Sequence, residues 1–426
     1  MKLVKSRTVV PFLALACVML FTLGAAARQT LTVFHYPRDY EVARIQQINE
    51  VFKAAHPDVE IETIVGWADK LDVSIVGGAP PDVIFTDPSM IPPMVMKDYL
   101  MPLEPFLERE DRIDLGSYIP ATLELTRWMG RQIGIPFQVN PNGLAFHKDL
   151  FNEAGVAYPD ENWTWDHFIS EGRKLTKDTN GDGTIDQWGL NGLWRSLHIW
   201  IYQGGGQIWS PDWRESVMAS PENVATMEFM WKLVNEYRVA PAVDDRAMFD
   251  NLKSAMVWEA QRFTNDPFYQ TGKIGLTRHA IGPTGTHVGT NNGDFVTLYR
   301  HTDQPDLAWE YLVTAIKVIE ERHVQGIEVG IPPQLDAISR KFSGGPYANI
   351  QPEIQMLGVL LGDGVPNLSN HPATNAFADF RNNVFMGKYI ANTEPINIQA
   401  ELQEMQRVTN SQLQEVLASG KKWWWD

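Results

Sequence analysis

Three short apolar runs separated by two amphipathic stretches restrict the fold of this chain more than any other feature. Residues 31–34, 59–64 and 82–85 have the composition of buried strands. Residues 42–55 repeat apolar side chains at helical spacing, and a second helical stretch ends at Gly77-Gly78. This strand–helix–strand–helix–strand order requires right-handed crossovers, so it predicts a largely parallel sheet. Ligands of such sheets bind beyond the carboxyl ends of the strands.

The remainder of the chain is mostly helical in pattern. A segment rich in Pro and Gly, 134–143, is typical of a crossover between domains, and strand-like residues return at 274–281 and 294–299. The spacing of apolar residues predicts helices over 147–154, 164–176, 221–237, 247–256, 306–320 and 396–418. With 426 residues, the chain is long enough for two or three core-sized units.

The first 27 residues have the pattern of an export signal. Lys2, Lys5 and Arg7 precede an apolar run, and Ala25-Ala26-Ala27 is a small-residue cleavage site. The pattern predicts cleavage after Ala27 and an exported, periplasmic protein. Cys17 lies inside the apolar run, without the residues that usually precede a lipid-modified cysteine, so we interpret it as part of the signal.

Composition and motifs exclude several classes of function. With 36 Lys and Arg against 52 Asp and Glu, the formal charge is −16, which argues against nucleic-acid binding. A single cysteine excludes an intramolecular disulfide framework. The chain contains no G-x-S-x-G, H-E-x-x-H or phosphate-binding loop motif, so no residue is predicted to be catalytic. Paired carboxylates for glycoside hydrolysis leave no local signature, which keeps a secreted polysaccharide-active enzyme as an alternative.

One loop resembles the front of a calcium-binding loop. Oxygen-bearing side chains occupy its positions 1, 3, 5 and 9, and a glycine occupies position 6. Position 12 is Gly189, where such loops carry a bidentate Glu. The pattern fits either a turn whose carboxylates cap their own backbone or a structural calcium site, and no other cofactor is predicted. The four candidate ligands are Asp178, Asn180, Asp182 and Asp186.

Tryptophan is abundant, and its distribution suggests a carbohydrate ligand. Nine of the 15 Trp lie between residues 163 and 258. A sugar ring has an apolar C–H face that stacks on an indole and a polar rim that needs carboxylates and amides. Most Trp side chains are core residues, so those in loops, such as Trp67 and Trp194, are the better binding candidates. The ten histidines show no metal-ligand spacing.

Several fragments, in order along the chain, resemble the extracellular solute-binding proteins of ABC importers, family 1, the maltose- and oligosaccharide-binding type. The resemblance covers nearly the whole chain after the signal. It rests on FKAAHP at 52–57, GGAPPDVI at 77–84, GIPF at 134–137, FHKDLF at 146–151, WTWDHF at 163–168, the Asp178 loop, SAM at 254–256 and AWEYL at 308–312.

The resemblance implies an α/β, two-lobed periplasmic-binding-protein (venus-flytrap) fold with mixed sheets and hinge crossovers. Residues 28–138 plus 279–327 would form the N-terminal lobe, and residues 139–278 plus 328–426 the C-terminal lobe. A carbohydrate would bind in the cleft between the lobes, and closure would present it to the permease subunits in the membrane. The protein would act as a monomer. A binding protein for a non-sugar solute is a further alternative.

Position after strand ends and near the crossovers nominates the ligand contacts. In the N-terminal lobe, residues follow the first, second and third strands, and two lie at the first crossover. Others come from the C-terminal lobe or lie near the returning strand. The candidates are Tyr36, Arg38, Trp67, Asp69, Asp87, Gln138, Asn140, Trp194, Trp258, Glu259, Asn291 and Asn292.

Overall fold

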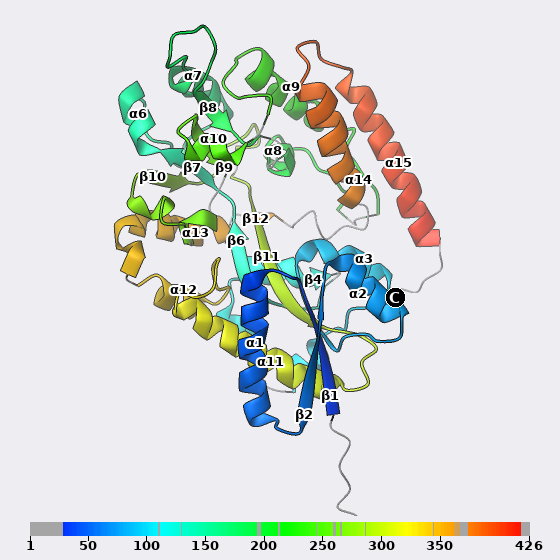
Figure 1. Ribbon diagram of the computed structural model, residues 1–426. Helices are drawn as coiled ribbons and strands as arrows, with labels where there is room; N and C mark the ends of the chain where they lie inside the picture. The colour runs from blue at the N-terminus through cyan, green and yellow to red at the C-terminus, as the bar shows by residue number, and fades with distance from the viewer. Residues whose placement is uncertain are drawn as a thin grey trace, which may run out of the picture.

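The chain folds into two lobes, each with its own sheet (Figure 1). The structure is a computed structural model that describes residues 29–418 except 110, 129, 194–196, 212–213, 244, 259–260, 265, 286, 344, 363 and 366–373. From residue 29 to 141 the elements are β1 (Gln29–His35), α1 (Asp39–Ala55), β2 (Val59–Val65), α2 (Ala68–Val76), β3 (Val83–Thr86), η1 (Pro88–Met90), α3 (Ile91–Met96), α4 (Glu104–Leu107), η2 (Leu115–Ser117), α5 (Pro120–Leu123), η3 (Glu124–Thr126), β4 (Arg127–Trp128), β5 (Arg131–Gln132) and β6 (Ile135–Pro141).

The rest of the chain supplies the second sheet and most of the helices. From residue 144 to 277 the elements are β7 (Leu144–His147), α6 (Lys148–Ala154), α7 (Trp165–Leu175), β8 (Trp188–Asn191), α8 (Leu197–Gln203), α9 (Pro221–Asn235), α10 (Arg246–Asp250), β9 (Ser254–Trp258), η5 (Gln261–Thr264), η6 (Tyr269–Thr271) and β10 (Ile274–Thr277). From residue 289 they are β11 (Gly289–Leu298), α11 (Pro305–Val324), α12 (Leu335–Lys341), η7 (Gly345–Ile350), α13 (Gln351–Gly362), β12 (Gly364–Val365), α14 (Thr374–Asp379), the π-helical η9 (Phe380–Ile390) and α15 (Ile398–Ala418).

The first sheet confirms the parallel arrangement predicted for the N-terminal segment. Strand β1 pairs in parallel with both β2 and β3. Strand β11 adds antiparallel to β3, which gives the order β12-β11-β3-β1-β2. Helix α1 buries Ile45, Ile48 and Phe52, one stripe at helical spacing, in the same core as Leu31 and Val33 of β1. The alternation seen in the sequence therefore builds the first lobe.

The second sheet has the order β10-β7-β9-β8, and all but the β8–β9 pair are antiparallel. The predicted helix over 247–256 is wrong in its second half. Residues 246–250 form α10, but Ser254–Trp258 form strand β9, which is buried along its whole length. Pairing with strands on both sides gives these residues more burial than a longer surface helix would.

Three segments connect the lobes. Strands β6 and β11 pair antiparallel, with an irregularity in register between Asp294 and Phe295. In Figure 1 these two strands run from the lower lobe toward the upper one. The third segment lies between α11 and α12 and joins β6 through the backbone pair Val139 and Ile331. The two-lobed fold with hinge crossovers and mixed sheets is thus present.

The structure moves two of the predicted lobe boundaries. Residues 279–288 still belong to the second lobe, because the Ile281 N–H donates to the Trp163 carbonyl at 2.6 Å. The chain therefore returns to the first lobe in β11, later than the predicted position near 279. Helix α12 packs on α11 of the first lobe, where Arg340 forms an ion pair with Glu320, although residues 328 onward were expected in the second lobe.

A buried ionic network fixes the third connection. Glu328 accepts hydrogen bonds from Arg44 of α1 at 2.6 Å and from Arg322 of α11 at 2.5 Å, with all three side chains nearly inaccessible. Burial opposes ionisation of Glu328, but Arg44 and Arg322 outweigh it and hold its pKa below the ordinary value. The Lys341 ammonium donates to the carbonyls of Glu328 and Gly330 at 2.8 and 2.6 Å. Among the described helices, none is long and apolar enough for a membrane span.

Candidate functional site

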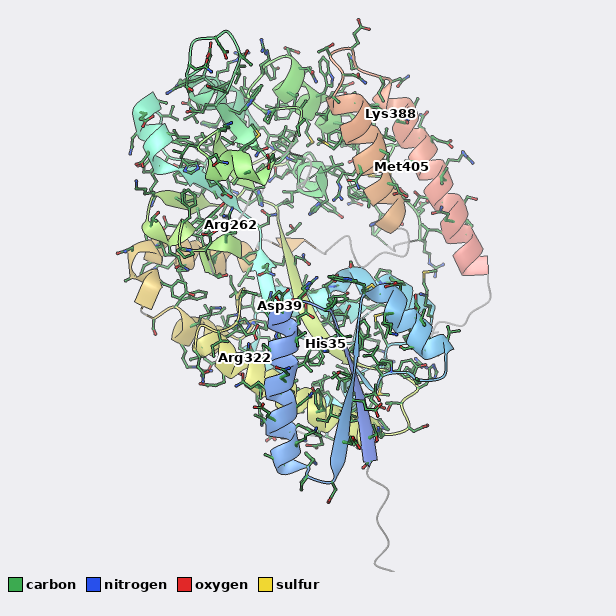
Figure 2. All side chains as sticks on the ribbon, viewed as in Figure 1. His35, Asp39, Arg262, Arg322, Lys388 and Met405 are labelled. Atoms are coloured by element: carbon green, nitrogen blue, oxygen red, sulfur yellow. The ribbon has the colours of Figure 1, made fainter. Side chains whose placement is uncertain are left out.

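Six side chains gather where the strands of the first sheet end, on the side of the lobe that faces the second lobe. Figure 2 labels two neighbours of this group, His35 and Asp39, at that end. We call the group the rim cluster, and its members are Tyr36, Arg38, Tyr40, Trp67, Asp87 and Asp294. The Tyr36 and Trp67 rings lie 5.1 Å apart, and the Arg38 guanidinium lies over both rings at 4.8 and 5.4 Å.

The aromatic part of the rim cluster is open to solvent. Trp67 is 51% exposed and Tyr40 38%, which is unusual for side chains of this size. Trp67 is held at the position before the first turn of α2, where the strand-to-helix connection leaves its ring at the surface. An exposed indole next to a second aromatic ring offers the flat apolar surface on which a planar or ring-shaped ligand stacks.

Two carboxylates, Asp87 and Asp294, lie near Tyr36 of this cluster. Asp87 caps η1, where it accepts the Ser89 N–H at 2.9 Å, and it also accepts the Tyr36 hydroxyl at 3.0 Å. Asp294 projects from β11 and, among the described residues, receives no hydrogen bond. Burial, with the charges of Glu41 and Asp87 adding to it and Arg44 opposing it, raises the pKa of Asp294 to about 7.

Amide side chains continue the polar surface along the two connecting strands. Strand register places Asn140 opposite Asn292 and Gln138 opposite Asp294. Gln138 is 2% exposed, and its Oε1 accepts from Arg44 at 3.3 Å. Asn140 Oδ1 is buried and has no hydrogen-bond partner in the described part of the chain, whereas the Asn291 side-chain amide donates to the Leu361 carbonyl at 2.9 Å. The structure therefore gives Asn291 a buried hydrogen bond, and its contact with a ligand stays a prediction.

The second-lobe candidates divide into one core residue and two that lie outside the described residues. Trp258 is 3% exposed and contacts Trp200 and Phe168 edge-to-face, with centroids 5.4 and 5.7 Å away. Its other neighbour is His279 at 4.3 Å. The structure therefore places the Trp258 ring in the core, and its contact with a ligand stays a prediction. Trp194 and Glu259 fall in the ranges that the structure does not describe.

Sequence reasoning found four of the six members of the rim cluster and missed two. Tyr36, Arg38, Trp67 and Asp87 were predicted from their positions after strand ends, and the structure brings them together. Tyr40 and Asp294 were missed. Asp294 could have been found from the sequence, because it stands in the middle of an apolar strand. Burial of a carboxylate there costs free energy unless a hydrogen-bond donor or a cation compensates for it. Asp69, also predicted, is exposed in the first turn of α2, two residues after Trp67.

The loop predicted as a turn or a calcium site uses its oxygens on its own backbone. Asp178 accepts from the N–H groups of Gly181 and Gly183, both at 2.7 Å. Asn180 accepts from the Asp182 N–H, and Asp186 accepts from both the N–H and the hydroxyl of Thr179. In the part of the chain that the structure describes, no three His, Cys, Asp or Glu side chains are grouped to hold a metal ion. Calcium at this loop stays a prediction.

A separate pocket of about 810 Å³ opens on the second lobe between α7, α9 and residues 281–283. Trp165 and Phe229 stack in its wall with centroids 4.7 Å apart. Asp166, Glu222 and Lys232 also line it. It contains none of the predicted ligand contacts, so it is a second place where a small molecule could lie.

Two sheets on separate lobes, three connections and a polar and aromatic rim at the strand ends define a two-lobed solute-binding protein. Comparison with known sequences agrees: residues 39–316 match the bacterial extracellular solute-binding proteins. The match spans well over half of the chain, and the chain belongs to this family.

The individual relatives have low sequence identity to this chain. The lactose-binding protein of Rhizobium radiobacter is 26% identical over 237 residues, which are 53% of this chain and 54% of that protein, so the alignment spans about half of each. An ABC substrate-binding protein from Listeria monocytogenes, solved in complex with cycloalternan, has a TM-score of 0.70 at 19% identity, over 91% of this chain and 99% of that one. The maltose/maltodextrin-binding domain MalE from Bdellovibrio bacteriovorus, bound to maltotriose, has a TM-score of 0.67 at 18% identity, over 90% and 100%. These structures share the fold.

Proposed function

We propose that this protein is the substrate-binding component of an ABC importer and that it binds a carbohydrate between its lobes. The observation that carries the proposal is the rim cluster, in which the exposed Trp67 ring lies beside Tyr36, whose hydroxyl donates to Asp87 and which also feels the charge of Asp294. This combination suits a sugar, whose C–H face stacks on the indole while its hydroxyls donate to the carboxylates. The family match supports the proposal, as do a lactose-binding relative and structures solved with cycloalternan and maltotriose.

The mechanism follows from the position of the cluster. A ligand held on the first-lobe rim gains further contacts when the second lobe closes over it, so binding shifts the population toward the closed form. The buried ion pair Arg44–Glu328 fixes the third connection to α1. The bending that closes the lobes would therefore take place in the other two connections, strands β6 and β11. The closed form would be the one that the permease subunits recognise.

Location and partners complete the proposal. The signal at residues 1–27 would direct the chain across the membrane to the periplasm, which agrees with the extracellular character of the family. The working unit would be a monomer that docks on its permease. It would release the sugar unchanged, because the chain carries no recognisable catalytic motif.

A thermal-shift screen tests the proposal. Residues 28–426 would be heated with lactose, maltotriose or cycloalternan, and with putrescine and a tripeptide as non-sugar solutes, and each sugar would be checked by chromatography afterwards. A bound sugar at a hundred times its Kd should add about 2.7 kcal/mol of stability. A rise in Tm with an intact sugar supports the proposal. A rise with sugar breakdown favours the enzyme, and a rise with putrescine or the tripeptide alone overturns the carbohydrate assignment.

A further inference from the structure

Asp294 is placed differently from the other carboxylates of this protein. It lies in the middle of β11, directly opposite Gln138 of β6, at the point where the register of the two strands becomes irregular. It is half-buried, and the flanking Gly293 and Phe295 are fully buried. A carboxylate in such a position loses hydration, so it needs donors to stay charged at low cost.

The groups around Asp294 have partners of their own. Those that act on its charge are Arg44, Glu41 and Tyr40 from α1, Arg38 and Tyr36 from the connection after β1, and Asp87 from the connection after β3. Arg44 is engaged with Glu328, and Arg38 donates to Glu41 at 2.7 Å. Asp87 is occupied by Tyr36 and Ser89. None of these groups donates to Asp294.

A second side chain beside Asp294 is also incompletely bonded. The Gln138 side chain is 2% exposed. Its Oε1 accepts a hydrogen bond from Arg44. Its amide nitrogen donates to no described residue. An open acceptor on β11 and an open donor on β6 therefore lie across from each other, and the charge of Asp294 acts on Tyr36 of the rim cluster. A hydroxyl group both donates and accepts, so it is the chemical group that satisfies this pair.

We propose that Asp294 is a ligand-binding residue that accepts hydrogen bonds from sugar hydroxyls, and that binding of the sugar releases a proton from Asp294 to solvent. The inference rests on the proposed function and adds to it a specific acceptor and a proton linkage. Hydroxyl donors stabilise the ionised carboxylate over the protonated one, so the bound sugar favours loss of the proton. The hydroxyl protons stay on the sugar, and one carboxyl proton passes to the buffer.

The size of the linkage follows from the charge state of the free protein. The pKa of Asp294 is raised to about 7, chiefly by burial, so about half of the free molecules carry the proton at pH 7. If the bound form is fully ionised, binding at pH 7 releases roughly 0.5 proton and affinity increases roughly tenfold between pH 6 and pH 8. If no sugar hydroxyl donated to Asp294, affinity would not increase from pH 6 to pH 8.

Isothermal titration calorimetry of residues 28–426 tests the proposal. Lactose, maltotriose and cycloalternan would be titrated at pH 6, 7 and 8, and at pH 7 in phosphate and in imidazole buffer, whose ionisation enthalpies differ. The same titrations would be made with Asp294→Asn and with Asp58→Asn, a control that changes an exposed carboxylate at the far end of α1.

Three outcomes separate the claims. We expect proton release by the wild type and by Asp58→Asn, and at least tenfold weaker binding without proton release by Asp294→Asn. Wild-type binding with no proton release, or with uptake, overturns the role of Asp294 and leaves the carbohydrate function standing; this arm does not depend on the folding of the variant. Binding of none of the three sugars by the wild type overturns the proposed function for these sugars, and the role of Asp294 with it.

Discussion

The two lobes use their large aromatic side chains in opposite ways. In the first lobe Trp67 is 51% exposed and forms an open surface with Tyr36. In the second lobe Trp165, Trp200 and Trp258 are at most 7% exposed and contact one another in a closed core. Trp163 and Trp209 are also at most 6% exposed, so most of the described Trp side chains between residues 163 and 258 pack in the second lobe.

The two lobes also differ in the burial and hydrogen bonding of their polar side chains. In the first-lobe rim the carboxylates Asp87 and Asp294 are half-buried. In the second-lobe core the indole N–H groups of Trp200 and Trp258 find no acceptor among the residues that the structure describes, and neither ring nitrogen of His279 makes a hydrogen bond of standard geometry to one of them. Burial lowers the pKa of His279 to about 3, so it stays neutral. The binding surface that we propose on the first lobe is thus polar, whereas the second-lobe core is built from buried rings.

The largest effect that separates the lobes is expected for Trp200→Ala. The Trp200 ring is completely buried against Trp165, Phe168 and Trp258, so its removal leaves a cavity. We expect a loss of about 3–5 kcal/mol in the free energy of unfolding, measured by urea denaturation. Trp67→Ala is the matched control and should change stability by less than about 1 kcal/mol. Equal losses for the two variants would contradict the assignment of one ring to the core and the other to the surface.

The connection between the lobes should be sensitive to Glu328→Gln. The change leaves Arg44 and Arg322 buried without a counter-charge and should cost about 3 kcal/mol at neutral pH. Because the folded-state pKa of Glu328 is lowered, its contribution is present above the ordinary Glu pKa and is lost as pH falls through the folded value. Urea denaturation at pH 7 and at pH 4 measures both effects. A variant as stable as the wild type at pH 7 would show that the network is dispensable.

His279 should make the second lobe lose stability in acid. Its folded-state pKa lies below the unfolded value near 6.5, so the unfolded chain binds the extra proton and stability is lost as pH falls through that value. This one group should account for about 1.4 kcal/mol between pH 7.5 and pH 5.5. His279→Asn should flatten the pH dependence of urea denaturation by that amount. An unchanged slope would mean that His279 is charged in the folded protein.

The effect of Trp67→Ala on binding tests the open surface of the first lobe. Loss of the stacking ring should weaken binding of the sugar found in the screen by about 1–1.5 kcal/mol, about tenfold, with little change in stability. Calorimetric titration measures the affinity. Tyr158→Ala, which removes a ring that is 40% exposed on the second lobe and lies outside the rim cluster, serves as the control. Undiminished affinity of Trp67→Ala would place the sugar elsewhere.

The smallest effect is expected for calcium. The oxygens of Asp178, Asn180 and Asp186 already accept hydrogen bonds within their loop, which keeps it folded without a cation. We expect EDTA or 1 mM Ca²⁺ to shift Tm by less than about 1 °C. A rise of several degrees with Ca²⁺ but not with Mg²⁺ would establish the calcium alternative, since a cation bound to the native state stabilises it.

The local pattern of the sequence predicted the first lobe better than the second. The alternation of β1, α1, β2, α2 and β3 is visible locally, and strand ends in a parallel sheet are forced to one edge. That is why Tyr36, Trp67 and Asp87 were found. The burial of Trp258 depends on how β9 pairs with β7 and β8. Such pairing joins residues far apart in the sequence, so a local pattern does not predict it.

Pairing across distant strands also explains the residues that were missed. Asp294 gains its significance from Gln138, which is far away in sequence and becomes its neighbour only through the antiparallel register of β6 and β11. The boundary near 279 was misplaced for the same reason, because Ile281 is held by a hydrogen bond to Trp163. Motif spacing predicts local secondary structure. The position of Asp294 and the boundary near 279 both depend on contacts between residues that are far apart in the sequence.

Hydrogen exchange of residues 28–426, followed by mass spectrometry with and without the sugar that raises Tm, tests the central claim most directly. The account predicts that sugar slows exchange at the rim, in the segments 36–41, 67–71 and 87–90, and in the connecting strands at 138–142 and 289–294. Protection confined to the pocket lined by Trp165 and Phe229, with the rim unchanged, would contradict it.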